Sequence, residues 1–175
     1  MQKLMAAGAV LLATCVFAEP ADLTKVGPAA RKVTDEKKTK LELETFFKAA
    51  DEADKKGDFD AAVAGIDFPV FMATDDLKGV PEARTYSKDE YVAMMKPMLE
   101  GMPKDLVTTH KRTIVVLSDS LANVIDDWTQ TMGKVKTTGK NATLVVKVGG
   151  AWKLKSMVEA GWGGMAEPAP APAKK

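Results

Sequence analysis

The chain has 175 residues, with 25 lysines and arginines against 24 aspartates and glutamates, and this length suits one domain with a modest core. Lys3 is the only charged residue among the first eighteen, so removing that segment leaves 24 basic against 24 acidic residues. A neutral protein has no general electrostatic reason to bind nucleic acid or anionic lipid, which argues against both classes of partner.

Residues 1–18, MQKLMAAGAVLLATCVFA, predict a secretory signal peptide. Lys3 precedes an apolar stretch that runs from Leu4 to Phe17, and Val16-Phe17-Ala18 places small residues where a signal peptidase reads them. The stretch is too short to be a membrane anchor. We therefore expect a periplasmic or secreted protein.

Cys15 is the only cysteine, and it lies inside this segment. Cleavage after Ala18 leaves no thiol, which excludes disulfides and thiolate metal sites in the mature chain. An alternative remains open, because Leu12-Ala13-Thr14-Cys15 resembles a bacterial lipobox. In that case the protein is a lipoprotein anchored to the membrane through Cys15.

The composition divides the rest of the chain into three parts. Residues 19–33 mix proline, glycine, alanine and charge without a period and predict a linker. Residues 166–175 alternate alanine and proline and predict an extended tail. The folded domain is expected between them, over residues 34–165.

The first half of that domain has helical periodicity. Residues 35–56 predict an amphipathic helix, with Gly57 at its end and Asp58 capping a short second helix through Ile66. Residues 69–74, PVFMAT, predict a short strand. Ser87 and Glu90 form a capping box before a third helix, in which Pro97 predicts a kink or an end.

From Leu106 onward the hydrophobic period changes to two, which predicts strands over 106–117, 121–132, 141–148 and 152–160. Residues 118–120, the TTGKN region and Gly149-Gly150 separate them. Helices followed by a meander of strands indicate an α+β fold, in which N-terminal helices pack into a curved, mostly antiparallel sheet.

Two hairpin registers follow from pairing apolar residues with apolar residues and opposite charges with each other across the strands. Pairing the strands around residues 118–120 puts Ile114 opposite Val124, Arg112 opposite Asp126 and His110 opposite Trp128. A three-residue loop over 149–151 puts Val148 opposite Trp152, Val146 opposite Leu154, Leu144 opposite Ser156 and Ala142 opposite Val158, which makes one face apolar. These glycines then form a corner of the sheet, because a phosphate-binding loop needs a helix after the glycines.

The order of elements resembles the nuclear-transport-factor-2-like (NTF2-like) superfamily, which includes SnoaL-like cyclases and ketosteroid isomerases. The resemblance spans residues 35–162 and rests on the long helix, KKGDFDAAVAGI, YSKDEYVAMM, DSLANVIDDWTQT and LVVKVGGAWKLKSM. It implies a cone-shaped fold with a pocket capped by the helices, and a homodimer formed through the outer sheet face. Function varies widely on such a fold.

Asp126 and His110, the only histidine, are the candidate catalytic residues. A pocket carboxylate acts as base in enzymes of the superfamily, but no motif here transfers that role to a given position. Arg112 opposite Asp126 favours ligand binding over proton transfer, because the arginine keeps the carboxylate ionised and a weak base. A structural cross-strand ion pair is the alternative.

The predicted cavity lining is mostly apolar. Methionines at helical spacing fill core or pocket gaps more often than they bind copper, so no metal and no cofactor is expected. The candidate ligand-binding residues are Arg112, Trp128, Tyr91, Met94, Met98, Val146 and Leu154.

Three functions remain open. The first is an exported, non-catalytic module that binds a small hydrophobic molecule or a peptide in an apolar pocket. The second is a SnoaL-like isomerase, dehydratase or cyclase that uses Asp126, with His110 and the tyrosines assisting. The third is a structural envelope protein whose pocket is filled by its own side chains.

Overall fold

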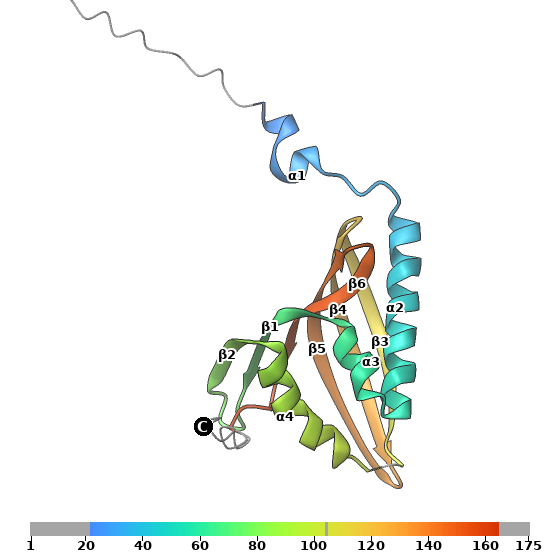
Figure 1. The fold of residues 1–175 in the computed structure, drawn as a ribbon, viewed down its shortest axis with the longest axis vertical. Coiled ribbons are helices and arrows are strands. Elements are labelled where there is room, and N and C mark those ends of the chain that lie inside the picture. The colour runs from blue at the N-terminus through green and yellow to red at the C-terminus, as the bar shows by residue number, and fades with distance from the viewer. Residues whose placement is uncertain (1–21, 104, 165–175) are drawn as a thin grey trace, which may run out of the picture. The chain divides into compact units, whose positions relative to one another are not determined.

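The computed structural model describes residues 22–103 and 105–164 (Figure 1). The chain divides into two units, Met1–Lys32 and Val33–Lys175. Two short helices, η1 (Leu23–Lys25) and α1 (Gly27–Ala30), lie within the predicted linker, and the Asp22 side chain caps the first of them. The predicted signal segment with Cys15 and the tail over 166–175 lie outside the described residues.

The second unit begins with the predicted helices. Helix α2 (Glu36–Lys56) starts at Asp35, whose carboxylate accepts the amide of Lys38 at 2.9 Å, and ends at Gly57 with a φ of 65°. Helix α3 (Phe59–Ala64) is capped by Asp58 but is shorter than expected. It ends early because the next strand begins at Ile66 and uses the backbone of that residue for sheet pairing.

Helix α4 (Lys88–Glu100) has the predicted capping box of Ser87 and Glu90. The helix continues three residues beyond Pro97, so the proline does not end it. No helix in the described part of the chain is long and apolar enough to span a membrane.

Six strands form one sheet in the order β2-β1-β6-β5-β4-β3. The pairing of β1 with β6 is parallel and every other pairing is antiparallel. The strands are β1 (Ile66–Asp75), β2 (Pro81–Tyr86), β3 (Val107–Ser118), β4 (Leu121–Met132), β5 (Val135–Val148) and β6 (Ala151–Glu159).

Strand β2 has no counterpart in the sequence prediction. Its residues, PEARTY, are almost all exposed on an edge strand, so they show no alternation of apolar and polar side chains. Strand β5 also starts at Val135 rather than at residue 141, because the chain turns at Gly133, which has a φ of 58°. The TTGKN region is therefore part of the strand and does not separate two strands.

Helices α2, α3 and α4 pack on one face of the sheet, here called the inner face (Figure 1). Leu154 of β6 contacts both apolar clusters on this face and joins them. The α2 cluster consists of Leu43, Phe47, Ala122, Val124, Val145 and Trp152. The cluster under α3 and α4 consists of Val63, Ile66, Val70 and Tyr91. The predicted α+β fold with helices on a curved, mostly antiparallel sheet is thus confirmed.

The predicted register of the β3–β4 hairpin is confirmed along most of its length. Ile114 pairs with Val124, Arg112 with Asp126 and His110 with Trp128. Only the end at the turn differs, where a bulge between Val116 and Ser118 pairs Ser118 with Leu121.

The predicted register of the β5–β6 hairpin is wrong near the turn. Gly149 and Gly150 form a two-residue turn with φ values of 59° and 86°, and Val148 pairs with Ala151. Val146 therefore lies opposite Lys153, and Val145 lies opposite Leu154 on the inner face. A bulge beyond Val145 restores the predicted pairs of Leu144 with Ser156 and of Ala142 with Val158, but these pairs lie on the outer face and not, as predicted, on the face of Trp152 and Leu154.

The prediction failed because it excluded a lysine from the inner face. Lys147 pairs with Trp152 and does point inward, where its amine lies 2.5 Å from the Glu42 carboxylate of α2. The Trp152 indole N–H also donates to Glu42, at 3.1 Å. The Lys147 ammonium, followed by the indole, holds the pKa of Glu42 below its ordinary value. A carboxylate from the helix thus makes an inward lysine acceptable at this place.

The corrected register makes a prediction about two neighbouring valines. Val145 is fully buried and Val146 is not, so Val145→Ala removes core packing while Val146→Ala removes a half-buried side chain from the outer face. We expect Val145→Ala to lower the free energy of unfolding by about 2 kcal/mol and Val146→Ala by less than half of that. Urea denaturation of both variants measures the difference. A larger loss for Val146→Ala would instead support the three-residue turn predicted from the sequence.

Candidate functional site

The inner face changes from apolar to polar at one level of the sheet. Four residues that pair across β3, β4, β5 and β6 mark this level, here called the polar row: Arg112, Asp126, Asn141 and Glu159. The next inward residues on these strands, on the side of the α2 cluster, are Ile114, Val124, Thr143 and Met157. Because side chains alternate along a strand, each strand brings one polar group to the same level of the inner face.

Helix α2 adds a carboxylate above the polar row. Leu43, Phe47 and Asp51 follow each other at four-residue intervals and so lie on one face of the helix. Leu43 and Phe47 pack into the core, which brings Asp51 over Arg112. The Arg112 guanidinium donates two hydrogen bonds to Asp51, at 2.8 and 2.6 Å, and lies 4.6 Å from the centre of the Phe47 ring.

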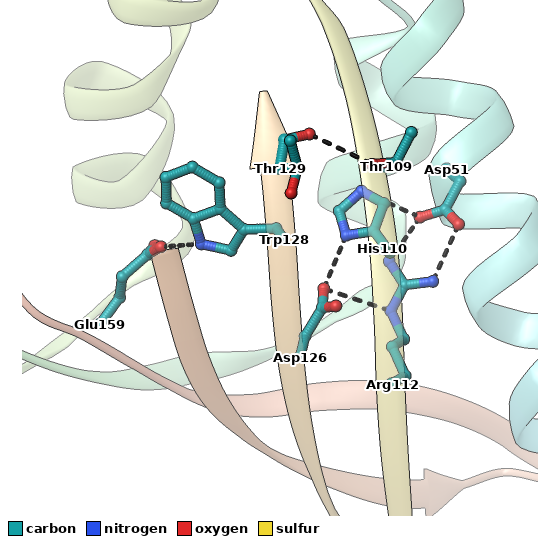
Figure 2. Close-up of polar contacts among 8 residues, drawn as sticks. All are labelled: Asp51, Thr109, His110, Arg112, Asp126, Trp128, Thr129 and Glu159. Atoms are coloured by element: carbon teal, nitrogen blue, oxygen red, sulfur yellow. Dashed lines mark hydrogen bonds and ion pairs between the residues drawn. The ribbon is translucent and has the colours of Figure 1, made fainter. Parts of the chain in front are cut away.

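Asp126 and His110 complete this network (Figure 2). One oxygen of Asp126, Oδ2, lies 2.7 Å from His110 Nδ1 and 3.4 Å from Arg112 Nε. His110 Nε2 lies 3.7 Å from Asp51. Two carboxylates, one guanidinium and one imidazole therefore connect α2, β3 and β4 (Figure 2).

The second oxygen of Asp126 has no hydrogen-bond partner among the described residues. The residue is only 5% exposed, so bulk water does not reach this oxygen freely. An unsatisfied buried carboxylate oxygen is costly, and in native proteins such an atom usually has a partner. Asp126 Oδ1 is thus a free acceptor on the inner face.

Trp128 and Glu159 form a second polar group beside the network (Figure 2). The Trp128 indole crosses the sheet over Gly139, where an added Cβ would lie 2.1 Å from Cζ2 of the ring. Its N–H donates to Glu159. Burial raises the pKa of Glu159 above its ordinary value, and the charge of Asp126 adds to this, while hydrogen bonds from Trp128 and Trp162 oppose it.

The segment after β6 brings Trp162 to the same place. Asp75 at the end of β1 accepts the amide of Gly161, at 2.7 Å, and its backbone carbonyl accepts the amide of Gly163, at 2.8 Å. A Cβ on Gly163 would lie 2.8 Å from the Asp75 backbone, so only glycine allows this close approach. The anchored segment bends back toward Glu159.

Trp128, Glu159 and Trp162 line a surface pocket of about 450 Å³. Its lining consists of Trp128, Thr138, Gly139, Lys140, Glu159, Ala160, Gly161 and Trp162. A second surface pocket, of about 390 Å³, lies between α3 and α4 and is lined by Phe59, Asp60, Val63, Ala64, Lys88, Asp89, Val92 and Lys96. We take the first pocket as the candidate site, because it adjoins the polar row.

The structure brings some of the predicted site residues together and separates others. Asp126, His110, Arg112 and Trp128 lie together on the inner face, as the register predicted. Arg112, however, is bound mainly by Asp51 rather than by Asp126.

The predicted apolar lining does not form either pocket. Tyr91 is a buried core residue, and burial raises the pKa of its hydroxyl to about 12. Met94 packs against the same cluster, Leu154 joins the two clusters, and Val146 lies on the outer face. Met98 is half-buried on α4 and lines neither pocket. The apolar part of the inner face is covered by the helices, which leaves the polar part for the pocket.

Three residues of the site were missed. Asp51 could have been found from its spacing after Leu43 and Phe47. Glu159 faces inward because of the bulge between Leu144 and Val145, which no sequence pattern indicates. Trp162 follows the last strand, where no periodicity indicates its position. Within the described ranges, no group of three or more histidine, cysteine, aspartate or glutamate side chains could hold a metal ion.

Comparison with solved structures identifies the fold. An NTF2-like protein from Shewanella oneidensis MR-1 matches with a TM-score of 0.56 and 24% identity, over 69% of this chain and 98% of that one. A ketosteroid isomerase-like protein from Erwinia carotovora atroseptica matches with a TM-score of 0.52 and 19% identity, over 72% and 97% of the two chains. The association domain of C. elegans CaMKII matches with a TM-score of 0.57 and 13% identity, over 71% and 96%.

No protein-family model and no curated protein sequence matches the chain. At these identities the likenesses show the fold and not the activity. The chain has the NTF2-like fold, as the order of its elements predicted.

The contacts in the ion network predict that replacing Arg112 lowers the free energy of unfolding more than neutralising Asp51 does. Arg112→Met leaves Asp51 and Asp126 facing each other with only His110 between them, whereas Asp51→Asn leaves Arg112 beside Asp126. We expect Arg112→Met to lower the free energy of unfolding by about 3 kcal/mol and Asp51→Asn by about 1 kcal/mol, measured by urea denaturation. Equal losses would contradict a contribution of the Arg112–Asp126 contact to stability.

The raised pKa of Glu159 predicts a pH-dependent stability difference. A carboxyl whose pKa is raised on folding contributes stability at low pH that is lost as the pH rises through the folded-state pKa. Glu159→Gln keeps a carbonyl acceptor for Trp128 and has no charge to bury. We expect it to melt at a higher temperature than the wild type at pH 7.5.

This advantage should shrink toward pH 4, where the carboxyl of the wild type becomes neutral. Thermal denaturation followed by circular dichroism at both pH values measures it. Glu44→Gln, on the exposed side of α2, is the control and should show no such change. A Glu159→Gln variant that is less stable at pH 7.5 would contradict the raised pKa.

Proposed function

We propose that this NTF2-like domain is a non-catalytic module that binds a small molecule in the pocket beside Glu159. The observation that carries this proposal is the convergence of two indoles and a half-buried carboxylate on a pocket of about 450 Å³. Pockets that bind small molecules usually combine aromatic walls with a few placed polar groups. Trp128 and Trp162 supply the walls, and Glu159 supplies the polar group.

Binding fits the inner face better than proton transfer through Asp126. His110 and Arg112 both occupy Oδ2 of that carboxylate, and Arg112 is itself bound by Asp51. Of the two tyrosines expected to assist, Tyr91 is buried in the other apolar cluster and Tyr86 packs against it. In this proposal Asp126 and His110 therefore contribute to the electrostatic potential beside the pocket.

One observation favours an enzyme as the second candidate. Glu159 has a raised pKa and no cationic partner among the described residues, which suits a group that exchanges protons with a ligand. An isomerase or lyase acting at this pocket would use Glu159 as its acid or base. A structural protein with a filled pocket is the third candidate.

Export and dimerisation belong to the same proposal. The apolar stretch from Leu4 to Phe17 supports a periplasmic or secreted protein, or a lipoprotein anchored through Cys15. Exposed apolar side chains on the outer sheet face support a homodimer. Phe71, Val115 and Val158 alternate with residues packed on the inner face and are 42, 49 and 41% exposed.

Native mass spectrometry of the protein purified from its own host tests the proposal. We expect a mature chain that begins after Ala18, a dimeric mass and a retained small molecule that is lost from Trp128→Ala. The enzyme alternative predicts instead that the molecule is chemically converted over hours of incubation. Protein that carries no ligand in both forms would remove the binding function and leave the structural alternative.

The same spectra test the dimer with a matched pair of variants. Val158→Lys places a charge on the outer face and should yield monomers. Leu77→Lys changes an apolar residue that is 94% exposed in the turn between β1 and β2, away from that face, and should remain dimeric. Identical masses for the two variants would contradict dimerisation through the sheet.

A further inference from the structure

The side chains around the pocket carry more negative than positive charge. The negative groups are the three carboxylates of Asp51, Asp126 and Glu159. Arg112 is the one permanently charged cation among the described residues of this network. His110 contributes a charge only when protonated. Lys140, at the pocket, is bound to Asp127 at 3.0 Å.

Glu159 is the carboxylate left without a counter-ion. Its partners are the indole N–H groups of Trp128 and Trp162, which are neutral donors. A half-buried carboxylate that has lost part of its hydration is stabilised by a nearby positive charge, and among the described residues no arginine, lysine or histidine pairs with it. A positively charged ligand would supply this missing counter-ion.

Asp126 provides a second, independent indication. Its Oδ1 atom is buried and has no hydrogen-bond partner among the described residues, although Oδ2 is bound by His110 and Arg112. Asp126 lies in the polar row with Glu159, separated from it by Asn141. Its negative charge acts on Glu159, so both carboxylates contribute to one negative potential.

The aromatic residues favour an organic cation over a metal ion. Indole rings attract ammonium groups through their negative faces, and tryptophan does so most strongly of the aromatic side chains. A metal ion would need at least three ligating groups, and the described residues gather no such set. Two tryptophans beside one unpaired carboxylate instead match the chemistry that binds alkylated ammonium groups.

We infer that the pocket takes a small organic cation, an alkylammonium or quaternary ammonium compound, with its positive head next to Glu159 and against the rings of Trp128 and Trp162. This inference rests on the proposed binding function and names its ligand class. Glu159 serves as the counter-ion, and Asp126 adds to the negative potential beside it.

Two probes of equal shape and unequal charge test the ligand class. Choline and 3,3-dimethyl-1-butanol differ only in having nitrogen or carbon at the branched centre, so they compare a cation with its neutral isostere. Each is titrated into the full mature chain at constant ionic strength, by calorimetry and by tryptophan fluorescence. We expect choline to bind at least tenfold more tightly, with a change in fluorescence from the pocket indoles.

Variants then locate the preference. Glu159→Gln should reduce choline affinity at least tenfold and bring it close to that of the neutral probe, whereas Glu44→Gln, with an exposed carboxylate on α2, should change neither. Trp162→Ala alters a side chain that is 42% exposed, so it reports on the pocket even if Glu159→Gln impairs folding. We expect it to weaken choline binding as well.

The outcomes separate this inference from the binding function. Equal affinity for both probes, or unchanged choline affinity in Glu159→Gln, would overturn the cation class while a retained host ligand keeps the binding function. Absence of choline binding would also overturn the cation class. Absence of choline binding together with protein that carries no host ligand would remove both.

Discussion

The packing of α2 against the sheet determines where chemistry is possible in this protein. Leu43 and Phe47 bury the apolar ends of β4, β5 and β6, with Val124, Val145 and Trp152 beneath them. The helix ends one turn beyond Asp51, close to the level at which the strands also become polar. The apolar part of the inner face is therefore covered, and the uncovered part of that face is the part that carries charge.

The polar row is then held by interactions between elements rather than within them. Arg112 connects β3 to Asp51 of α2, and His110 connects β3 to Asp126 of β4. Such a network rigidifies a site when every member is satisfied, and one unsatisfied atom in it is a place for an external partner. Here that atom is Asp126 Oδ1, while Glu159 lacks a counter-ion among the described residues.

A shared fold does not imply a shared activity. A ketosteroid isomerase-like protein and the association domain of C. elegans CaMKII are similar in fold to this chain at 19 and 13% identity. In this chain the pocket beside the polar row is lined by two tryptophans and a carboxylate, and one oxygen of Asp126 is bound by His110 and Arg112.

The sequence by itself determined the helices, most strand boundaries and one hairpin register, because these follow from local periodicity and from the pairing of like faces. The opposite charges of Arg112 and Asp126 and the apolar pair of Ile114 and Val124 agreed on the same alignment. Only the tertiary structure decided which way Val145 and Val146 face, because an inward Lys147 is stable only where Glu42 of a distant helix meets it. It also decided the partner of Arg112 and the position of Trp162, since both depend on residues brought together by packing over long separations in the chain, which no local pattern encodes.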